Sequence, residues 1–414
     1  MAKVAVLGHG VVGSGVVELF EKSQASIAKK AGQSMEVKRI LDLREFPSLS
    51  YADRFTKDFD EILNDPEIVT VAEVMGGLHP AYEYTKAALE AGKNVVTSNK
   101  ELVAEKGADL LAVAKANNVN YFFEASVGGG IPIIRPMHMC LAANEIDEVV
   151  GILNGTTNFI LTKMIHEQMK FSDALKLAQQ LGYAERNPAA DVEGHDACRK
   201  ICILASLAYG KQIYPEAVHT DGITGITLED VDYAENWGGV IKLIGFARRL
   251  PEEMVEIFVG PAFVSHESQL ANIDDVFNGI LVRGDATGDV VFYGKGAGKL
   301  PTASAVVADM IHVTKLGRTS NSLTWIDDGK NHVADYLDGI RAFYVRCVAE
   351  DVEDAKLLIH GAFGDVKQLS RDGMPENELA FITGEIPERQ LLAGIQKLSD
   401  SGIKTISKIR VLAD

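Results

Sequence analysis

The chain has 414 residues, of which 47% are hydrophobic and 24% charged, and its 58 Asp and Glu outnumber its 41 Lys and Arg, so the formal net charge is −17 at pH 7. This composition supplies enough apolar material for two or three packed domains and excludes a disordered or fibrous chain. The negative charge argues against nucleic acid or an anionic membrane as a partner, and four scattered cysteines are too few for a disulfide framework or a structural zinc site.

The first 144 residues alternate strands with helices. Strands are expected at residues 3–7, 37–41, 69–73, 94–97 and 120–123, and helical patterns run to about residue 30 and over residues 82–91 and 104–117. This alternation predicts an α/β fold whose first domain, residues 1–144, is a doubly wound parallel sheet of the Rossmann type. The early first strand leaves no room for a signal peptide, and no apolar run reaches the ~18–20 residues of a membrane helix. We therefore expect a soluble, cytoplasmic protein.

Gly8, Gly10 and Gly13 form a G-x-G-x-x-G motif directly after the first strand. The first glycine allows a tight turn, the second lets the backbone approach a pyrophosphate, and the third packs the helix on the strand. The helix N-terminus offers amides to the phosphates. Glycines at any strand–helix turn can mimic this motif, so its position in a β-α-β unit carries the prediction of a dinucleotide site.

Asp42 ends the second predicted strand and could accept a hydrogen bond from the adenosine ribose 2′-hydroxyl, which favours NAD over NADP. It lies farther from Gly8 than the usual ~20 residues, so an extended first helix or an insertion is implied. Arg44 could instead bind the 2′-phosphate of NADP, and a solvated turn is the alternative without function.

Two further motifs follow strands of the first sheet, where ligands bind at the carboxyl ends. Lys100 is expected in the crevice beside the nicotinamide, although Ser98 or Asn99 could simply cap a helix with Lys100 in solvent. The glycine-rich stretch 124–132 could direct backbone carbonyls to a cation or amides to an anion. A similar loop at residues 294–298 precedes a helix and could cover the cofactor.

From about residue 145 the pattern changes to an α+β domain, residues 145–299. A strand is expected at residues 149–153, helices at 157–167, 173–181 and 199–209, and short strands between residues 256 and 291. A long apolar helix, residues 300–316, is expected to return to the first sheet and complete it.

The stretch AQQLGYAERNPAADVEGHDACRK, residues 178–200, concentrates charged side chains. Pro188 and Gly194 impose turns, so the carboxylates before Gly194 lie on a loop. Asp196 and Lys200 are four residues apart at the start of an apolar helix and share one face. A surface ion pair is the alternative, but the helix that follows is almost wholly apolar. A lysine in a partly buried site can have a lowered pKa and exchange a proton, with the aspartate orienting it. His195, Cys198 and Cys202 are assigned to neither a metal nor a nucleophile.

The tail, residues 338–414, follows a predicted linker at residues 317–337. A strand is expected at residues 340–349, a helix at 352–363, two or three strands around 376–382, a helix at 388–400 and a strand at 408–412. This β-α-β-β-α-β order is the ferredoxin-like pattern.

Together these motifs resemble those of bacterial homoserine dehydrogenases over about residues 1–320. The signature spans residues 178–200, with Asn187 at a position where Asp is commoner. SNK at residues 98–100, EASVGGGIPII at 124–134, ILNGTTNFIL at 152–161 and GKGAGKLPTASAVVAD at 294–309 are also similar to family motifs. The tail is similar to an ACT domain.

The resemblance implies reversible NAD(P)-dependent interconversion of L-aspartate 4-semialdehyde and L-homoserine, in threonine and methionine biosynthesis. Lys200 would be the proton donor or acceptor, with Asp196 close by and Lys100 assisting, and Glu185 and Asp191 would hold the substrate ammonium group. The residues implied at the cofactor are Gly8, Gly10, Val11, Val12, Gly13, Asp42, Lys100, Gly182 and Gly298. A structural monovalent cation, usually sodium, is implied at Glu124, Val127, Gly129 and Ile131, largely through backbone carbonyls.

The resemblance also implies a homodimer or a higher homo-oligomer, and threonine as an effector at the tail. Residues 350–355 of the tail lack the Asp-x-Pro-Gly turn common in ACT domains, so the tail could instead serve dimer contacts. Two other functions stay open. Another Rossmann oxidoreductase, such as aspartate-semialdehyde dehydrogenase, needs a cysteine near the nicotinamide. A catalytically idle sensor of nucleotides and amino acids would not need the Asp196–Lys200 pair.

Overall fold

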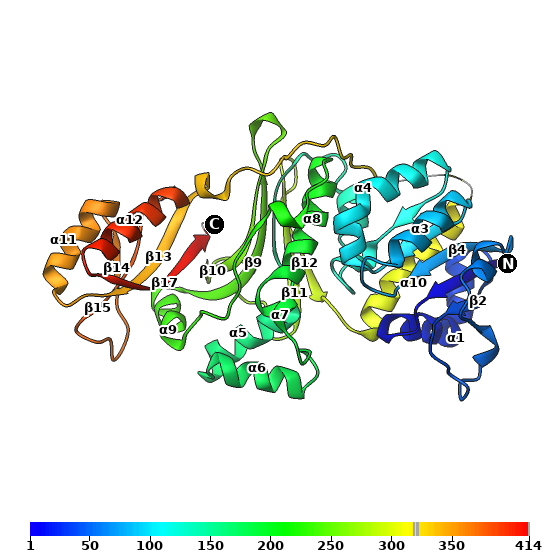
Figure 1. Cartoon of the computed structure of the whole chain (residues 1–414), viewed down its shortest axis with the longest axis horizontal. Helices are drawn as coiled ribbons and strands as arrows, with labels where there is room; N and C mark the ends of the chain where they lie inside the picture. The colour runs from blue at the N-terminus through cyan, green and yellow to red at the C-terminus, as the bar shows by residue number, and fades with distance from the viewer. Residues whose placement is uncertain (318, 320–322, 413–414) are drawn as a thin grey trace.

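The computed structural model describes residues 1–317, 319 and 323–412, which form an elongated molecule of three parts laid end to end (Figure 1). The N-terminal part lies at one end and the C-terminal part at the other. Among the described helices, none combines the length and the apolarity that would be needed to cross a membrane.

The N-terminal part is built on a six-stranded parallel sheet with the order β3-β2-β1-β4-β5-β6, which is the Rossmann order and confirms the predicted fold class. The strands are β1 (Ala2–Leu7), β2 (Met35–Leu41), β3 (Phe55–Thr56), β4 (Ile68–Glu73), β5 (Asn94–Thr97) and β6 (Tyr121–Phe122). Strand order reverses between β1 and β4, so the crevice at their carboxyl ends is where such folds bind ligands.

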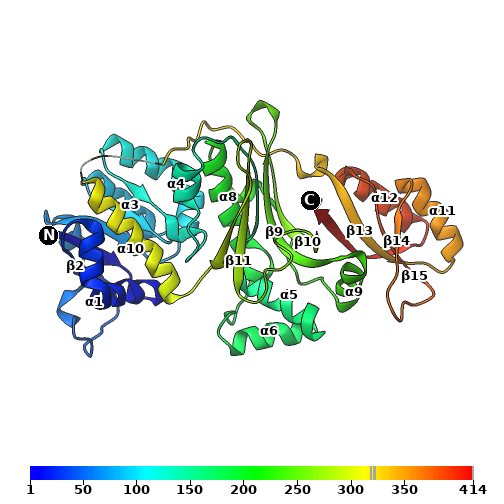
Figure 2. The ribbon, with the colours of Figure 1, turned by 180° about the vertical axis from the view of Figure 1, so that it is seen from behind.

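Helices cover both faces of this sheet. They are α1 (Val11–Ala31), the short α2 (Asp60–Leu63), α3 (Ala81–Glu90), α4 (Lys100–Ala116) and α10 (Lys299–Leu316). Figure 2 shows α10 lying beside α1. The 21 residues of α1 explain why Asp42 lies so far from Gly8 in sequence. Asn99 caps α4 by accepting a hydrogen bond from the Leu102 amide at 3.1 Å, so Lys100 is the first residue of this helix.

The second sheet has eleven strands and runs through the middle and C-terminal parts in the order β12-β11-β7-β9-β10-β17-β13-β15-β14, with β8 paired to β10 and β16 paired to β13. Its middle strands are β7 (Ile146–Ile152), β8 (His219–Thr220), β9 (Gly239–Arg249), β10 (Val255–Ser265), β11 (Phe277–Gly284) and β12 (Gly288–Lys295). Strand β9 was not predicted from the sequence, and neither was α9 (Leu228–Trp237).

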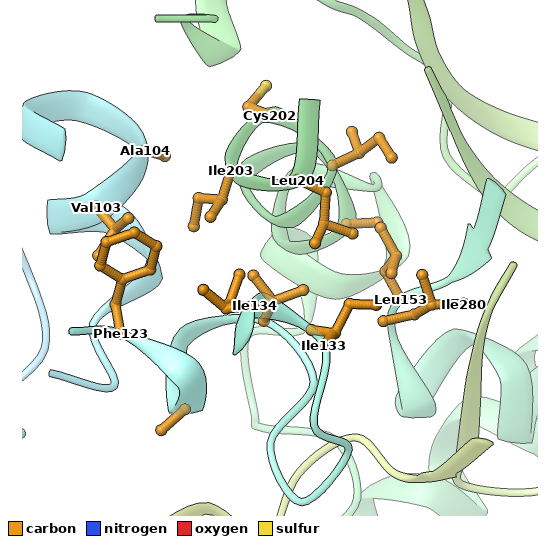
Figure 3. Packing of buried hydrophobic residues seen from close by; sticks show 14 of the residues in the cluster. Val103, Ala104, Phe123, Ile133, Ile134, Leu153, Cys202, Ile203, Leu204 and Ile280 are labelled. Carbon is orange, nitrogen blue, oxygen red and sulfur yellow. The ribbon is translucent and has the colours of Figure 1, made fainter. Parts of the chain in front are cut away.

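Four more helices belong to the middle part: α5 (Gly155–Glu167), α6 (Phe171–Gln180), α7 (Ala189–Val192) and α8 (His195–Tyr209). The apolar helix α8 lies between α4 and the second sheet. Its Ile203 faces Val103 and Ala104 of α4, while Leu204 faces Leu153 and Ile280 (Figure 3). This packing fixes α8, and with it Lys200, at the junction of the first two parts.

The C-terminal part has the predicted ferredoxin-like order. It contains β13 (Ile340–Val348), α11 (Val352–Phe363), β14 (Lys367–Leu369), β15 (Glu378–Ile382), β16 (Ile386–Pro387), α12 (Glu388–Asp400) and β17 (Lys404–Leu412). Strand β17 pairs in parallel with β10, with Arg410 opposite Ala262. The C-terminal sheet therefore continues the middle sheet.

The segment predicted as a linker is partly packed. Residues 318 and 320–322 of it lie outside the described residues. Trp325 is buried, donates a hydrogen bond to Gln212 at 2.8 Å, and lies so close to Gly107 of α4 that a Cβ there would be 2.4 Å from its ring. Val333 forms a β-bridge with Val255. Much of the segment is thus fixed against the N-terminal and middle parts.

Candidate active site

The G-x-G-x-x-G turn forms a cradle at the N-terminus of α1. Gly8 has a φ of +97°, and a Cβ on Gly13 would lie 1.9 Å from the Gly8 carbonyl oxygen, so both positions require glycine. Beside Gly10, no described heavy atom lies within 4 Å of where a Cβ would be. No described side chain caps α1, and Val11 is 68% exposed. The helix therefore presents free amides and open space, as a diphosphate requires.

Asp42 lies beside this cradle, with Arg44 paired to it. The Asp42 carboxylate accepts from the His9 amide at 2.8 Å and from Arg44 Nε and Nη2 at 2.9 and 2.8 Å. This contact with Arg44 holds the Asp42 pKa below its usual range. Both residues border a surface cavity of about 370 Å³ that Phe46, Phe55 and Lys57 also line. The cavity therefore offers both signs of charge at the end of β2.

A buried carboxylate joins the two lysines singled out in the sequence. Asp196 Oδ2 accepts from Lys200 Nζ at 2.8 Å, and Asp196 Oδ1 forms an ion pair with Lys100 Nζ. Lys200 Nζ also donates to the Leu153 carbonyl at 2.8 Å. The Lys200 side chain is 9% exposed, whereas that of Lys100 is 41% exposed. Lys100 comes from α4 and Lys200 from α8, so this cluster bridges the first two parts of the molecule.

The environment changes the three pKa values in different directions. Burial lowers the pKa of Lys200, and the Asp196 carboxylate offsets only part of this effect. Burial also opposes the charge on Lys100, but Asp196 outweighs it and raises the Lys100 pKa. Burial also disfavours the charged form of Asp196, yet the two ammonium groups hold the Asp196 pKa below the usual range. Of the two lysines, Lys200 is thus the one whose proton is held less tightly than usual.

Asn154 connects Asp191, in the segment between α6 and α8, to this cluster and was not predicted as a site residue. Its Nδ2 donates to Asp191 at 2.7 Å and to Asp196 at 2.9 Å, while its Oδ1 caps α5 by accepting from the Thr157 amide at 2.9 Å. Burial raises the pKa of Asp191, although the Asn154 hydrogen bond opposes the shift. The LNGTT sequence after a predicted strand is a helix-start signal that could have pointed to Asn154.

The structure brings together Lys100, Asp191, Asp196 and Lys200, but not Glu185. The Glu185 side chain is exposed, and its backbone carbonyl accepts from Gln179 Nε2 at 3.0 Å. Gly182 lies in an exposed turn after α6. Gly298 directly precedes α10, whose first carbonyl, that of Lys299, would lie 2.8 Å from a Cβ on Gly15. Gly298 is therefore next to the first turns of α1.

The glycine-rich loop at residues 124–132 interlocks with the loop at residues 294–298. A Cβ on Gly129 would lie 2.3 Å from the Gly296 carbonyl oxygen, and the Gly130 amide donates to the Lys295 carbonyl at 3.0 Å. The buried Glu124 carboxylate accepts from the amides of residues 133, 134 and 135 at 2.6, 2.9 and 2.8 Å. Among the described residues there is no group of three or more His, Cys, Asp or Glu that could hold a metal. A cation in this loop would therefore depend on backbone carbonyls.

All four cysteines, which lie within the described ranges, are free thiols. Cys198 and Cys202 of α8 are buried, and Cys202 belongs to the core cluster shown in Figure 3. Burial raises the pKa of Cys202 well above its usual value. This environment disfavours a thiolate at Cys202, whereas the contact with Cys202 lowers the pKa of Cys198.

Comparison with known proteins agrees with this geometry. The model of the homoserine dehydrogenase NAD-binding domain matches residues 8–124, and the homoserine dehydrogenase model matches residues 132–311. Homoserine dehydrogenase of Synechocystis sp. is 37% identical over 433 residues, covering 99% of each chain, and that of Bacillus subtilis is 41% identical, covering 80% of this chain and 77% of the relative. A homoserine dehydrogenase structure from Thiobacillus denitrificans has a TM-score of 0.90 and 36% identity, covering 99% of this chain and 98% of that one.

The chain belongs to the homoserine dehydrogenase family. It is an NAD(P)-dependent oxidoreductase that acts on the CH–OH group of a small molecule, homoserine, in amino-acid biosynthesis. The resemblance inferred from the sequence is confirmed, and the two alternative functions are not supported.

Two single variants, Gly13→Ala and Gly10→Ala, should distinguish the effect of the glycine turn on stability from its effect on cofactor binding. Gly13→Ala should cost about 1–3 kcal/mol of stability, because its Cβ would overlap the Gly8 carbonyl. Gly10→Ala should change stability by less than about 0.5 kcal/mol, because the space is open. It should nevertheless weaken nicotinamide cofactor binding, because the methyl group occupies the approach to the backbone. Calorimetry and fluorescence titration measure both effects; unchanged cofactor affinity in Gly10→Ala would contradict the cradle.

Proposed function

We propose that Lys200 exchanges the proton at the substrate oxygen in the interconversion of homoserine and aspartate 4-semialdehyde. The observation that carries this proposal is the buried Asp196 carboxylate held between Lys200 and Lys100. Of the three N–H bonds of the Lys200 ammonium, one donates to Asp196 and one to Leu153. The third is available for an oxygen of the substrate.

The nicotinamide, when bound, supplies or accepts the hydride at the carbon atom of the reacting group. In the reductive direction Lys200 donates its proton to the oxygen on which negative charge develops, and becomes a neutral amine. Asp196 orients it, and Lys100 contributes a second positive charge near the developing alkoxide. In the oxidative direction neutral Lys200 accepts the hydroxyl proton. The lowered pKa of Lys200 favours both transfers, because the neutral form is then reached closer to neutral pH.

Asp191 is proposed to bind the substrate ammonium group. It lies next to the cluster through Asn154, and its carboxylate is not paired with a cation by any described contact within hydrogen-bond distance. A substrate ammonium would offset the burial that raises its pKa. Glu185 is proposed for the same role, and its exposed side chain would have to turn toward Asp191. Gly182 stays a prediction at the nicotinamide.

For the cofactor we propose NAD rather than NADP. Asp42 places a carboxylate at the end of β2, where it can accept from a ribose hydroxyl and repel a 2′-phosphate. The opposing feature is Arg44, whose guanidinium is 62% exposed and could reach a phosphate if it left Asp42. The paired geometry favours NAD because the carboxylate neutralises the arginine.

The remaining proposals concern the cation, the effector and the assembly. We propose a structural sodium ion held by the loop of Glu124, Val127, Gly129 and Ile131 through backbone carbonyls, since the Glu124 carboxylate is already engaged by the amides of residues 133–135. Threonine is proposed as an effector at the C-terminal part. A homo-oligomer through the middle part is proposed from the family resemblance. A cytoplasmic location stays a prediction.

Lys200→Met should lower turnover by about two to four orders of magnitude while the affinity for NAD stays unchanged, because only the proton transfer is lost. Lys93→Met is a matched control. Lys93 is also buried and donates to two carbonyls, those of residues 65 and 68, but it precedes β5 at the opposite end of the first sheet from the crevice. Turnover is followed by the absorbance of reduced nicotinamide with homoserine and each of NAD and NADP, with and without threonine. Near-normal turnover of Lys200→Met would exclude the assignment.

The pH dependence of hydride transfer should report the charge on Lys200. Homoserine oxidation needs neutral Lys200, so its rate should rise with pH, with a midpoint below that of an ordinary lysine. Asp196→Asn removes a charge that raises the Lys200 pKa, so the midpoint should move to lower pH. Lys100→Gln removes a charge that lowers it, so the midpoint should move to higher pH. Single-turnover rates across pH test this; shifts in the same direction would contradict the proposal.

Asp42→Ala and Arg44→Ala should change cofactor preference in opposite directions. Asp42→Ala should weaken NAD binding about tenfold and NADP binding less, because a ribose acceptor is lost and Arg44 is released. Arg44→Ala should weaken NADP and leave or improve NAD. Dissociation constants of both cofactors for both variants measure this. Equal changes for the two cofactors would show that this pair does not contact the ribose.

A further inference from the structure

The C-terminal part is linked to the segment between α6 and α8, which carries Asp191, through one buried arginine. Arg410 lies on β17, opposite Ala262 of β10, and is 4% exposed. Its Nε and Nη2 donate to Glu388 of α12 at 3.0 and 2.7 Å, and its Nη1 donates to Asp221 of the middle part at 2.7 Å. The guanidinium thus joins Glu388 of the C-terminal part to Asp221 of the middle part.

The site around Arg410 is shaped for this contact. A Cβ on Gly260 of β10 would lie 2.6 Å from Arg410 Nη1, so glycine leaves the space that the guanidinium fills. The guanidinium also lies over the Phe258 ring, 4.8 Å from its centroid. His219 Nε2 contacts the same Asp221 oxygen at 3.0 Å and stacks on Tyr336. Charge, shape and stacking therefore all fix Asp221.

The segment that begins at Asp221 packs directly on residues 192–194, which lie between Asp191 and Asp196. The Ile223 amide donates to the Val192 carbonyl at 2.9 Å, and a Cβ on Gly222 would lie 2.5 Å from that carbonyl oxygen. A Cβ on Gly194 would lie 3.3 Å from the Asp221 carbonyl oxygen. Residues 221–223 therefore hold the backbone of residues 192–194, which directly follow Asp191.

We propose that Arg410 is a positioning residue for substrate binding: by fixing Asp221, the C-terminal part sets the position of residues 191–194 and hence of the Asp191 carboxylate. This inference rests on the proposed role of Asp191 toward the substrate ammonium. It gives the C-terminal part a function in the reaction itself, whether or not an effector binds there. Arg410 does not touch the reacting atoms, so its loss should affect substrate binding more than turnover.

The first test is steady-state kinetics of the full chain with Arg410→Gln, which removes the charge but keeps a long side chain. KM for homoserine should rise about 5- to 10-fold, the range of a modest coupling between sites. kcat and the dissociation constant of NAD should stay within about twofold. Arg389→Gln is the matched control, because Arg389 belongs to the same part and pairs with Asp335 and Asp338, but is 57% exposed. It should leave all three constants unchanged.

Two further variants separate positioning from general loss of stability. Gly260→Ala should displace the guanidinium without removing any charge and should raise KM in the same way. Arg410→Lys should restore KM partly, because an ammonium can reach one of the two carboxylates but cannot bind both in the fork geometry. A double variant of Arg410→Gln with Asp221→Ala should be no worse than the more severe single variant, because both act through one contact.

Asp191→Asn, measured in parallel, keeps this inference distinct from the proposed function. If Asp191→Asn leaves KM unchanged, the role of Asp191 is wrong and so is the positioning that depends on it. If Asp191→Asn raises KM while Arg410→Gln and Gly260→Ala do not, the coupling alone is overturned. If the Arg410 variants lose thermal stability, kcat and NAD affinity together with KM, the arginine is structural and the proposal is also overturned.

Discussion

The active site depends on one carboxylate that neutralises two lysines from different parts of the chain. Asp196 lies in the first turn of α8, where the helix dipole favours a negative charge, and Lys200 follows one turn later. Lys100 arrives from the first residue of α4. Burying an isolated carboxylate is costly, and two ammonium groups and the Asn154 amide offset that cost. The cluster is therefore complete only when the N-terminal and middle parts are packed together, because each part contributes one of the two lysines.

Features defined by short-range pattern could be predicted from the sequence. The Asp196–Lys200 spacing on an apolar helix indicated a shared face, and the structure has both side chains on one buried cluster. Helices α11 and α12 begin and end where periodicity indicated. The glycine turn at Gly8 is equally local, since φ > 0 and a close backbone contact are needed at fixed spacing.

What could not be predicted depends on contacts between residues far apart in the chain. Asn154 acquires its role because Asp191 and Asp196 are folded onto it, and asparagine before a helix is otherwise an ordinary cap. Strand β9 is apolar on both faces and resembles a buried helix segment in pattern alone. Glu185 was assigned with Asp191 from the family resemblance, and in the structure the loop turns its side chain to solvent. Arg410 gave no local signal, because its partners come from α12 and the segment after β8.

The chain crosses between the first two parts at separate edges of their interface. In Figure 1 the connection from β12 to α10 runs along the lower edge, and residues 323–337 run along the upper edge. Gly296 lies on the connection from β12 to α10 and interlocks with Gly129, which lies on a further crossing from β6 to β7, and buried Trp325 anchors residues 323–337. Any closure of the crevice over substrate therefore has to move these connections together and to shift α4 against α8, because the two helices pack on each other.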